Sequence, residues 1–141
     1  MERLLMETIP MAKREALMLN PLQLAYIGDT VWDLLIRTAL VYTGNNVHAM
    51  HKMASARVNA GAQAKLVEAL LPHLSEDELT LVKRGRNTRS KHPVPKNQDA
   101  ADYGYATGFE ALIGFLYLTG DHERIKALYH LGEEYHAGKN P

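Results

Sequence analysis

The segment 103–118 constrains the fold most strongly, because it is apolar on nearly every side of a helical wheel yet contains one acid, Glu110. A helix that is apolar all round belongs in the interior of a protein, covered by other elements. Glu110 is the only acidic or basic side chain in that segment. The rest of the chain must therefore surround 103–118 and also accommodate a carboxylate.

Helix signals dominate the remainder of the sequence. The expected helices cover 11–18, 22–42, 47–70 with a break allowed near 55–59, 75–87, 100–118 and 122–136. Asn20-Pro21 is a typical helix start, Ser75 and Glu78 form a capping pattern, and Asp121 is a cap for the last helix. Because no convincing alternating strand pattern or second domain is found, we expect one all-α bundle over residues 1–141.

A second acidic position lies in the stretch "YIGDTVWD", residues 26–33. On a helical wheel one broad apolar stripe is made by Leu24, Ile27, Val31, Leu34 and Leu35, and Trp32 and Ile36 extend it on one side. Asp29 falls at the edge of this extension, and Asp33 lies four residues further along the same face. This stretch therefore also combines core-like residues with carboxylates.

A carboxylate in apolar surroundings is costly unless it is paired, protonated or bound to a metal. No Lys or Arg lies on 103–118 to pair with Glu110. Gly28, Gly108 and Gly114 would let two helices approach closely, which could bring Asp29 and Glu110 together. Because two adjacent carboxylates repel, a divalent cation with a preference for oxygen ligands, Mg²⁺ or Mn²⁺, would stabilise them.

The alternative is that each acid is structural and caps a helix or pairs with a distant base such as Arg37 or Arg57. For either acid taken singly, this alternative is the more frequent situation. The two acids together, beside glycines that permit close packing, favour a metal site.

The segment Lys83–Gln98 contains six of the 16 Lys and Arg residues and no acid. Gly85, Ser90 and two prolines favour a loop over the whole of 83–98. Its side chains suit RNA phosphates and 2′-hydroxyls, although charge runs are often only solvated. The candidate RNA-binding residues are Lys83, Arg84, Arg86, Asn87, Arg89, Lys91, Lys96 and Asn97.

Composition narrows the class of protein. The formal net charge is zero, so a polyanionic partner must be recognised by locally concentrated charge. The absence of cysteine excludes disulfides and thiolate metal sites and fits a cytoplasmic protein. We expect neither a signal peptide nor a membrane span, because residues 1–20 contain charges throughout and the longest apolar run is short.

These motifs resemble a known family. "YIGDTVWD", preceded by Leu24-Ala25, resembles the signature helix of the ribonuclease III endonuclease domain, and "FEALIGFLYL" (residues 109–118) resembles its second motif. The short chain, the absence of a double-stranded RNA-binding domain and the "GRN…PKN" segment resemble the Mini-ribonuclease III branch, which consists of the catalytic domain alone.

The resemblance implies a homodimeric, Mg²⁺-dependent endoribonuclease, with Mn²⁺ as a substitute metal, that cleaves double-stranded RNA in the maturation of 23S ribosomal RNA precursor ends. It implies that Asp29 is the catalytic, metal-binding acid of the first motif and that Glu110 is that of the second. The larger enzymes of the family have two further carboxylates where this chain has Ala25 and Thr107. Asp33 and Asp102 are therefore candidates for outer-shell support.

Two other classes remain open from the sequence. A non-catalytic RNA-binding helical module would bind RNA without cleaving it and would be indifferent to Mg²⁺. A helical scaffold would use both acids structurally, and Asp29→Asn would then leave the fold intact.

Overall fold

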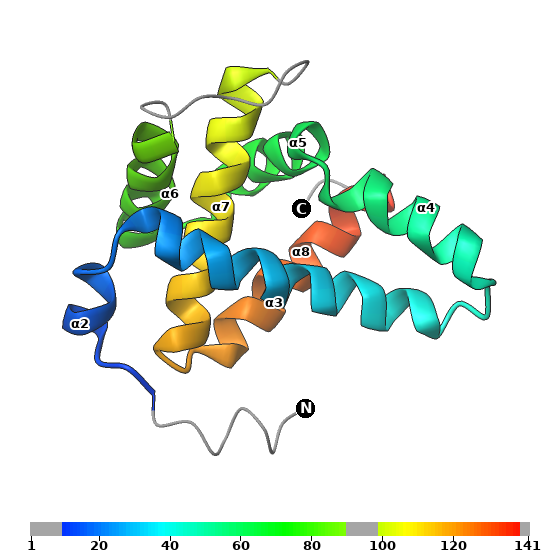
Figure 1. Ribbon diagram of the computed structural model, residues 1–141, viewed down its shortest axis with the longest axis horizontal. Helices are drawn as coiled ribbons and strands as arrows, with labels where there is room; N and C mark the ends of the chain where they lie inside the picture. The colour runs from blue at the N-terminus through cyan, green and yellow to red at the C-terminus, as the bar shows by residue number, and fades with distance from the viewer. Residues whose placement is uncertain (1–9, 90–98, 139–141) are drawn as a thin grey trace.

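The computed structural model describes residues 10–89 and 99–138 and contains helices and turns but no strand in those ranges. The helices are α2 (Lys13–Leu17), α3 (Pro21–Val41), α4 (Val47–Val58), α5 (Ala60–Leu70), the 3-10 turn η1 (Leu71–His73), α6 (Glu76–Arg89), α7 (Ala100–Leu118) and α8 (His122–His136) (Figure 1). The all-α prediction is confirmed.

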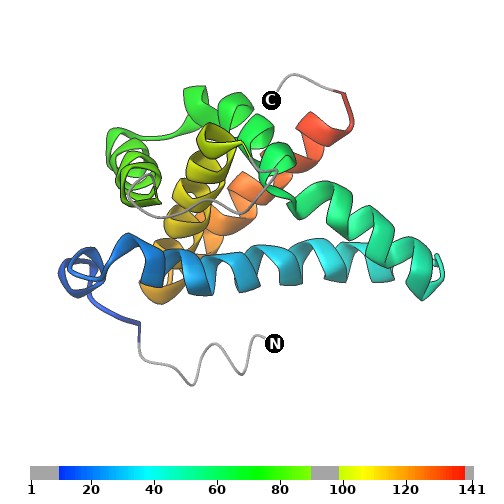
Figure 2. The same cartoon turned by 45° about the horizontal axis from the view of Figure 1, so that its top comes forward.

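Helix α7 is the centre of the bundle, as its apolar sequence predicts. It packs against α3, α5, α6 and α8, and the long helix α3 crosses it in both views (Figures 1 and 2). The core includes Trp32 of α3 and Phe109 of α7, whose rings meet edge to face at 4.8 Å between centroids. No helix in the described ranges is long and apolar enough to cross a membrane.

The crossing of α3 and α7 depends on two glycines. A Cβ atom added to Gly28 would overlap the carbonyl oxygen of Glu110, and one added to Gly114 would overlap the carbonyl oxygen of Leu24. The backbones of the two helices therefore touch directly, as predicted. Gly108 has a different role from the predicted one, because an added Cβ there would overlap Val82 of α6.

The buried face of α3 is rotated from the predicted stripe. The buried side chains include Leu24, Trp32 and Ile36, whereas Leu34 is 38% exposed. The physical reason is the close crossing at Gly28: residues four apart from Gly28 and from one another lie on the face that meets α7. Trp32 and Ile36, which the sequence predicted at one side of the apolar stripe, therefore lie at the centre of the buried face of α3.

Side-chain caps define the helix starts that the sequence predicts. The Asn20 carboxamide accepts from Leu22 N–H at 2.8 Å, and Gln23 bonds back to the Asn20 N–H at 3.0 Å. Asp121 accepts from the N–H of Arg124 at 3.2 Å. The predicted break in 47–70 is also present: Asn59, in extended conformation, ends α4 and caps α5.

The predicted loop over 83–98 is wrong for its first half. Residues 83–89 continue α6, because Gly85 packs against Gly108 of α7 instead of ending the helix. Arg86 and Arg89 in the last turn also suit the negative end of the helix dipole. Residues 90–98 lie outside the described ranges.

Candidate active site

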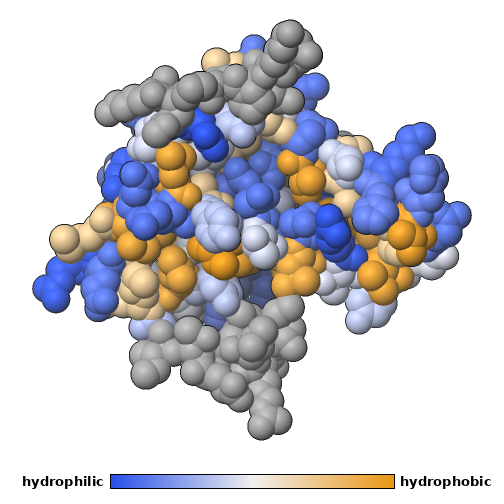
Figure 3. Space-filling model, viewed as in Figure 1, coloured by the Kyte–Doolittle hydropathy of each residue, from blue (hydrophilic) through white to orange (hydrophobic). Residues whose placement is uncertain are grey.

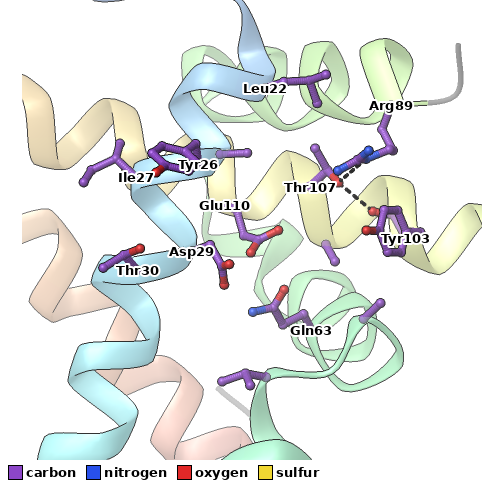
Figure 4. Close-up of a pocket in the computed structure, with 14 residues that line it drawn as sticks. Leu22, Tyr26, Ile27, Asp29, Thr30, Gln63, Arg89, Tyr103, Thr107 and Glu110 are labelled. Atoms are coloured by element: carbon purple, nitrogen blue, oxygen red, sulfur yellow. Dashed lines mark hydrogen bonds between the residues drawn. The ribbon is translucent and has the colours of Figure 1, made fainter. Parts of the chain in front are cut away.

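A cavity of about 650 Å³ lies where α3, α5, α6 and α7 meet (Figure 4). It is lined by Leu22, Ala25, Tyr26, Ile27, Asp29, Thr30, Val58, Ala60, Gln63, Arg89, Tyr103, Ala106, Thr107 and Glu110. Asp29 reaches it from α3 and Glu110 from α7, so the two acids that the sequence singles out share one cavity. The glycine crossing is what places them side by side.

The two carboxyl groups differ in exposure and interact strongly. Asp29, expected at the edge of the extended apolar stripe, is exposed, because it lies at the rim of the α3–α7 contact. Glu110 is half-buried, and its pKa is raised from 4.5 to about 9. Burial is the largest cause, followed by a hydrogen bond with Asp29 and repulsion by its charge. Without a cation, the pair is held at the cost of protonating Glu110.

The donor set fits a divalent cation that prefers oxygen ligands but provides few anionic ligands. Within residues 10–89 and 99–138, no group of three or more His, Cys, Asp or Glu side chains could hold a metal ion. Ala25 and Thr107, one turn before Asp29 and Glu110 respectively, line the same cavity and bring no charge. A cation at this site would therefore keep several water ligands, as Mg²⁺ commonly does.

Arg89, at the end of α6, adds a positive group to the same cavity. Its Nε donates to the Thr107 hydroxyl at 3.2 Å, and its guanidinium lies 4.6 Å from the centre of the Tyr103 ring. Its charge partly offsets the increase in the pKa of Glu110. Of the predicted RNA-binding residues in the described ranges, Arg89 is the one that lines this cavity.

The two predicted outer-shell acids lie elsewhere. Asp33, one turn beyond Asp29, pairs with Arg37 on α3 at 2.9 Å. Asp102 lines a separate cavity of about 360 Å³ with Lys65, Glu68 and other residues of α5 and α7. Neither side chain lines the cavity that holds Asp29 and Glu110.

The other basic residues of the predicted loop are distributed over α6. Lys83 is exposed, and Arg84 donates to the Leu17 carbonyl at 3.3 Å on the α2 side. Arg86 donates to the Tyr105 hydroxyl at 3.1 Å and to Asn87 at 3.2 Å. Lys91, Lys96 and Asn97 fall outside the described ranges.

Sequence reasoning missed Gln63, which is only 2% exposed and lines the cavity from α5. A signal was available, since Gln63 lies three and four residues before the buried Leu66 and Val67 and hence on the apolar face of its helix. A polar residue in such a stripe marks a position where the interior is not apolar.

Comparison with known proteins places this geometry in a family. Residues 22–121 match the model of the Ribonuclease III domain. The Mini-ribonuclease 3 of Desulfitobacterium hafniense is 50% identical over 108 residues, which cover 76% of this chain and 68% of that protein. The Mini-ribonuclease 3 of a Thermoanaerobacter species is 46% identical over 122 residues, which cover 86% of this chain and 85% of that protein.

A solved structure agrees with these matches. The crystal structure of a protein from Fusobacterium nucleatum superposes with a TM-score of 0.74 at 31% identity, covering 79% of this chain and 91% of that one. The matched range of the family model contains both Asp29 and Glu110 as well as the helices that bring them together. The chain belongs to the ribonuclease III family.

Proposed function

We propose that this endoribonuclease-family chain hydrolyses double-stranded RNA with Mg²⁺ at Asp29 and Glu110, leaving a 5′-phosphate. The observation that carries the proposal is the carboxyl pair at the α3–α7 crossing, where the pKa of Glu110 is raised to about 9. A cation bound between two such carboxylates would remove their repulsion and so would be strongly stabilised there. The family membership supplies the reaction class.

Asp29 and Glu110 are the residues that would hold the cation. When bound there, Mg²⁺ would supply Lewis acidity, which lowers the pKa of a water and offsets charge on a phosphate. The exposure of Asp29 leaves one side of the pair open to an approaching substrate. The half-buried Glu110 lies deeper and is fixed by the backbone contact at Gly28.

Arg89 would bind a phosphate of the RNA at this site. Its hydrogen bond to Thr107 and its stacking on Tyr103 fix the guanidinium, so little side-chain entropy remains to be lost when a phosphate binds. A guanidinium can bind phosphate through two parallel hydrogen bonds. Arg89 thus complements the negative pair across the cavity.

Outside the cavity, RNA contact would come from the basic residues that the sequence singles out. Lys83, Arg84, Arg86 and Asn87 on α6 are accessible in part, and Lys91, Lys96 and Asn97 follow in 90–98. Phosphate contacts of this kind make binding fall steeply with salt. A-form RNA exposes its minor groove and 2′-hydroxyls, so recognition would depend mainly on shape.

A homodimer would provide two such sites for the two strands. The exposed surface of α3 and its ends carries large apolar and aromatic side chains that favour a second copy: Met18, Tyr26, Leu34, Val41 and Tyr42. Figure 3 shows hydrophobic surface at the tip where α3 meets α4, and Val41 and Val47 are exposed there. A two-fold axis would repeat each contact once.

As the cellular role we propose cytoplasmic maturation of 23S ribosomal RNA precursor ends, which the resemblance to the Mini-ribonuclease III branch implies and the match to relatives named Mini-ribonuclease 3 supports. A regular RNA double helix is recognised mainly by its shape and by its 2′-hydroxyl and phosphate groups, so such a substrate needs no deep base-reading pocket. A precursor stem that pairs both ends of an RNA would suit such a site.

The test is cleavage of a long double-stranded RNA by the purified protein in Mg²⁺ or EDTA, with folded Asp29→Asn and Glu110→Gln variants. We expect cleavage in Mg²⁺ only, and a loss of at least about a thousandfold in both variants. Glu68→Gln, which removes an exposed carboxylate lining the Asp102 cavity, is the matched control and should retain activity. Cleavage in EDTA, or undiminished cleavage by both variants, would contradict the proposal.

The alternative is a non-catalytic RNA-binding helical module. Its supporting observation is that the site has two carboxylates, with Ala25 and Thr107 uncharged. RNA binding by the parent protein without cleavage in Mg²⁺ or Mn²⁺ would favour it. Neither binding nor cleavage would favour a helical scaffold instead.

A further inference from the structure

Gln63 is a buried polar residue whose side chain is directed at the carboxyl pair. It is 2% exposed, and its carboxamide lies in the cavity facing the carboxyl groups of Asp29 and Glu110 (Figure 4). The buried polar or charged side chains in the described ranges are Gln63, Glu78 and Thr107, and two of these three line this one cavity. The polar interior of the molecule is therefore concentrated at the acid pair.

The position of Gln63 is fixed by the start of α5. Its backbone N–H donates to the Asn59 carbonyl at 3.0 Å, and the Asn59 carboxamide accepts from the Ala62 N–H at 2.9 Å. Val58 and Ala60 of the same junction also line the cavity. The α4–α5 break thus presents the fourth residue of α5 to the carboxylates from the side opposite α3.

The carboxamide has no structural partner in residues 10–89 and 99–138. No hydrogen bond among the described residues uses its oxygen or nitrogen, in contrast to Thr107, which bonds to the Tyr103 carbonyl and to Arg89. The buried side-chain atoms without a partner in those ranges are Asp33 Oδ1 and Arg57 Nε, so the Gln63 carboxamide, although its residue is almost fully buried, opens onto the cavity instead of being enclosed in the core. A Leu of similar length would fill the same space without needing a hydrogen-bond partner. A purely structural reading leaves the choice of Gln at this position unexplained.

We propose that Gln63 is a positioning residue of the active site, where its carboxamide donates to the Asp29–Glu110 pair and accepts from water held between them. This inference rests on the proposed function. The site has two carboxylates and two uncharged neighbours, Ala25 and Thr107, so a neutral donor and acceptor can orient the acids without adding negative charge. Partners of this kind commonly change metal affinity by about 10- to 100-fold.

The test compares the parent protein with Gln63→Leu and Gln63→Glu, using Mn²⁺ alone as the probe. Mn²⁺ affinity is measured by calorimetry, thermal unfolding is measured in EDTA, and single-turnover cleavage is measured with the same RNA duplex. Gln63→Leu should unfold in EDTA at the same or a higher temperature than the parent. Its Mn²⁺ affinity should fall by about tenfold or more, with a parallel fall in the cleavage rate.

Gln63→Glu keeps the length of the side chain and adds a third carboxylate. It should bind Mn²⁺ at least as tightly as the parent protein and unfold at a lower temperature in EDTA, where the added charge has no counter-ion. If Gln63→Leu fails to fold, this variant decides, and weakened Mn²⁺ binding by Gln63→Glu would overturn the inference. Mn²⁺ affinity of Gln63→Leu within twofold of the parent would also overturn it.

Asp29→Asn separates this inference from the proposed function. If the parent binds Mn²⁺ and Asp29→Asn does not, the metal site of the proposed function is supported. An unchanged Mn²⁺ affinity of Gln63→Leu would then overturn only the role of Gln63. If the parent binds no Mn²⁺, both are overturned. Glu68→Gln serves again as the control on α5, where Mn²⁺ affinity should not change.

Discussion

Glu78 and Glu110 are both acids that folding removes from water, but their surroundings shift their pKa values in opposite directions. Glu78 meets a base: Arg124 of α8 donates from Nε and from a terminal nitrogen, both at 2.8 Å. Burial alone would raise the pKa of Glu78, but the hydrogen bonds from Arg124 and Ser75 and the charge of Arg124 together lower it. Glu110 instead meets Asp29, and its pKa rises to about 9.

The comparison teaches how to separate a structural acid from a functional one. The Glu78 carboxylate is fully matched, since it also accepts from the Ser75 N–H at 2.9 Å, and Arg124 further bonds the His73 carbonyl at 2.7 Å. The Glu110 carboxyl faces a second acid beside an open cavity. Burial is common to both, so the site is marked by the lack of a base paired directly with Glu110, whose raised pKa the charge of Arg89 offsets only in part.

The largest change in the free energy of unfolding is expected when Glu78, the acid paired with Arg124, is removed. Glu78→Ala should lower the free energy of unfolding at pH 7 by about 3 kcal/mol, because Arg124 loses its partner and the Ser75 N–H at the start of α6 loses the carboxylate that accepts from it. The pKa of Glu78 is lowered on folding, so this stability is present above pH 4.5 and is lost as the pH falls through the folded value. Urea unfolding at several pH values measures it. The exposed Glu76, substituted by Ala, is the control, and an equal loss for both would contradict the comparison.

The second effect is stabilisation of the folded protein by Mg²⁺ bound at Glu110, the acid without a paired base. Mg²⁺ at a hundred times its dissociation constant should stabilise the parent protein by about 2.7 kcal/mol, because the cation binds the folded state. Glu110→Gln should show little of this stabilisation, whereas Glu78→Ala should keep it. Thermal unfolding across a Mg²⁺ titration gives the answer. Equal stabilisation of the parent and Glu110→Gln would place the cation elsewhere.

The third effect concerns pH in the absence of metal. The pKa of Glu110 rises from 4.5 to about 9 on folding, so its stabilising contribution is complete below pH 4.5 and is lost as the pH rises towards 9. In EDTA at pH 8, Glu110→Gln should therefore be more stable than the parent by about 1–2 kcal/mol, a value reduced for the partial exposure of the group. The difference should vanish near pH 4.5. If the free energies of unfolding of the parent and of Glu110→Gln changed with pH in parallel, Glu110 would not be destabilising when it is ionised beside Asp29.

The smallest effect is expected at Asp33. Its partner Arg37 is exposed, and the second oxygen of the Asp33 carboxylate, Oδ1, is buried without a partner, so the pair adds little and Asp33→Asn should change the free energy of unfolding by less than about 0.5 kcal/mol. Mn²⁺ affinity should also stay the same, since Asp33 does not line the cavity. A clear loss of Mn²⁺ affinity, measured by calorimetry, would instead restore the outer-shell role that the sequence suggested.

Much of the fold could be predicted from local patterns. The capping residues Asn20, Ser75 and Asp121 act where the sequence places them, because a cap bonds to backbone groups two or three residues away. The loop prediction for 83–89 failed because Gly85 was judged locally. The decisive contact, with Gly108 of α7, comes from a distant part of the chain.

The candidate site shows the same division. Asp29 and Glu110 could be singled out because an acid in an apolar helix is conspicuous in the sequence itself. Arg89 was included only as one member of a basic run, and its place in the cavity depends on its contacts with Thr107 and Tyr103. Gln63 was missed because an uncharged residue in an apolar stripe gives a weaker signal.

The sequence by itself determined the helices, the interior position of α7 and the two acids, because helix propensity, capping and periodicity act over a few residues. Only the tertiary structure decided which face of α3 is buried and which basic residue of α6 reaches the acids. It also decided that Asp33 and Asp102 turn away from the site. These outcomes depend on contacts between residues far apart in the chain, above all the backbone contact of Gly28 with α7, whose geometry no local pattern specifies.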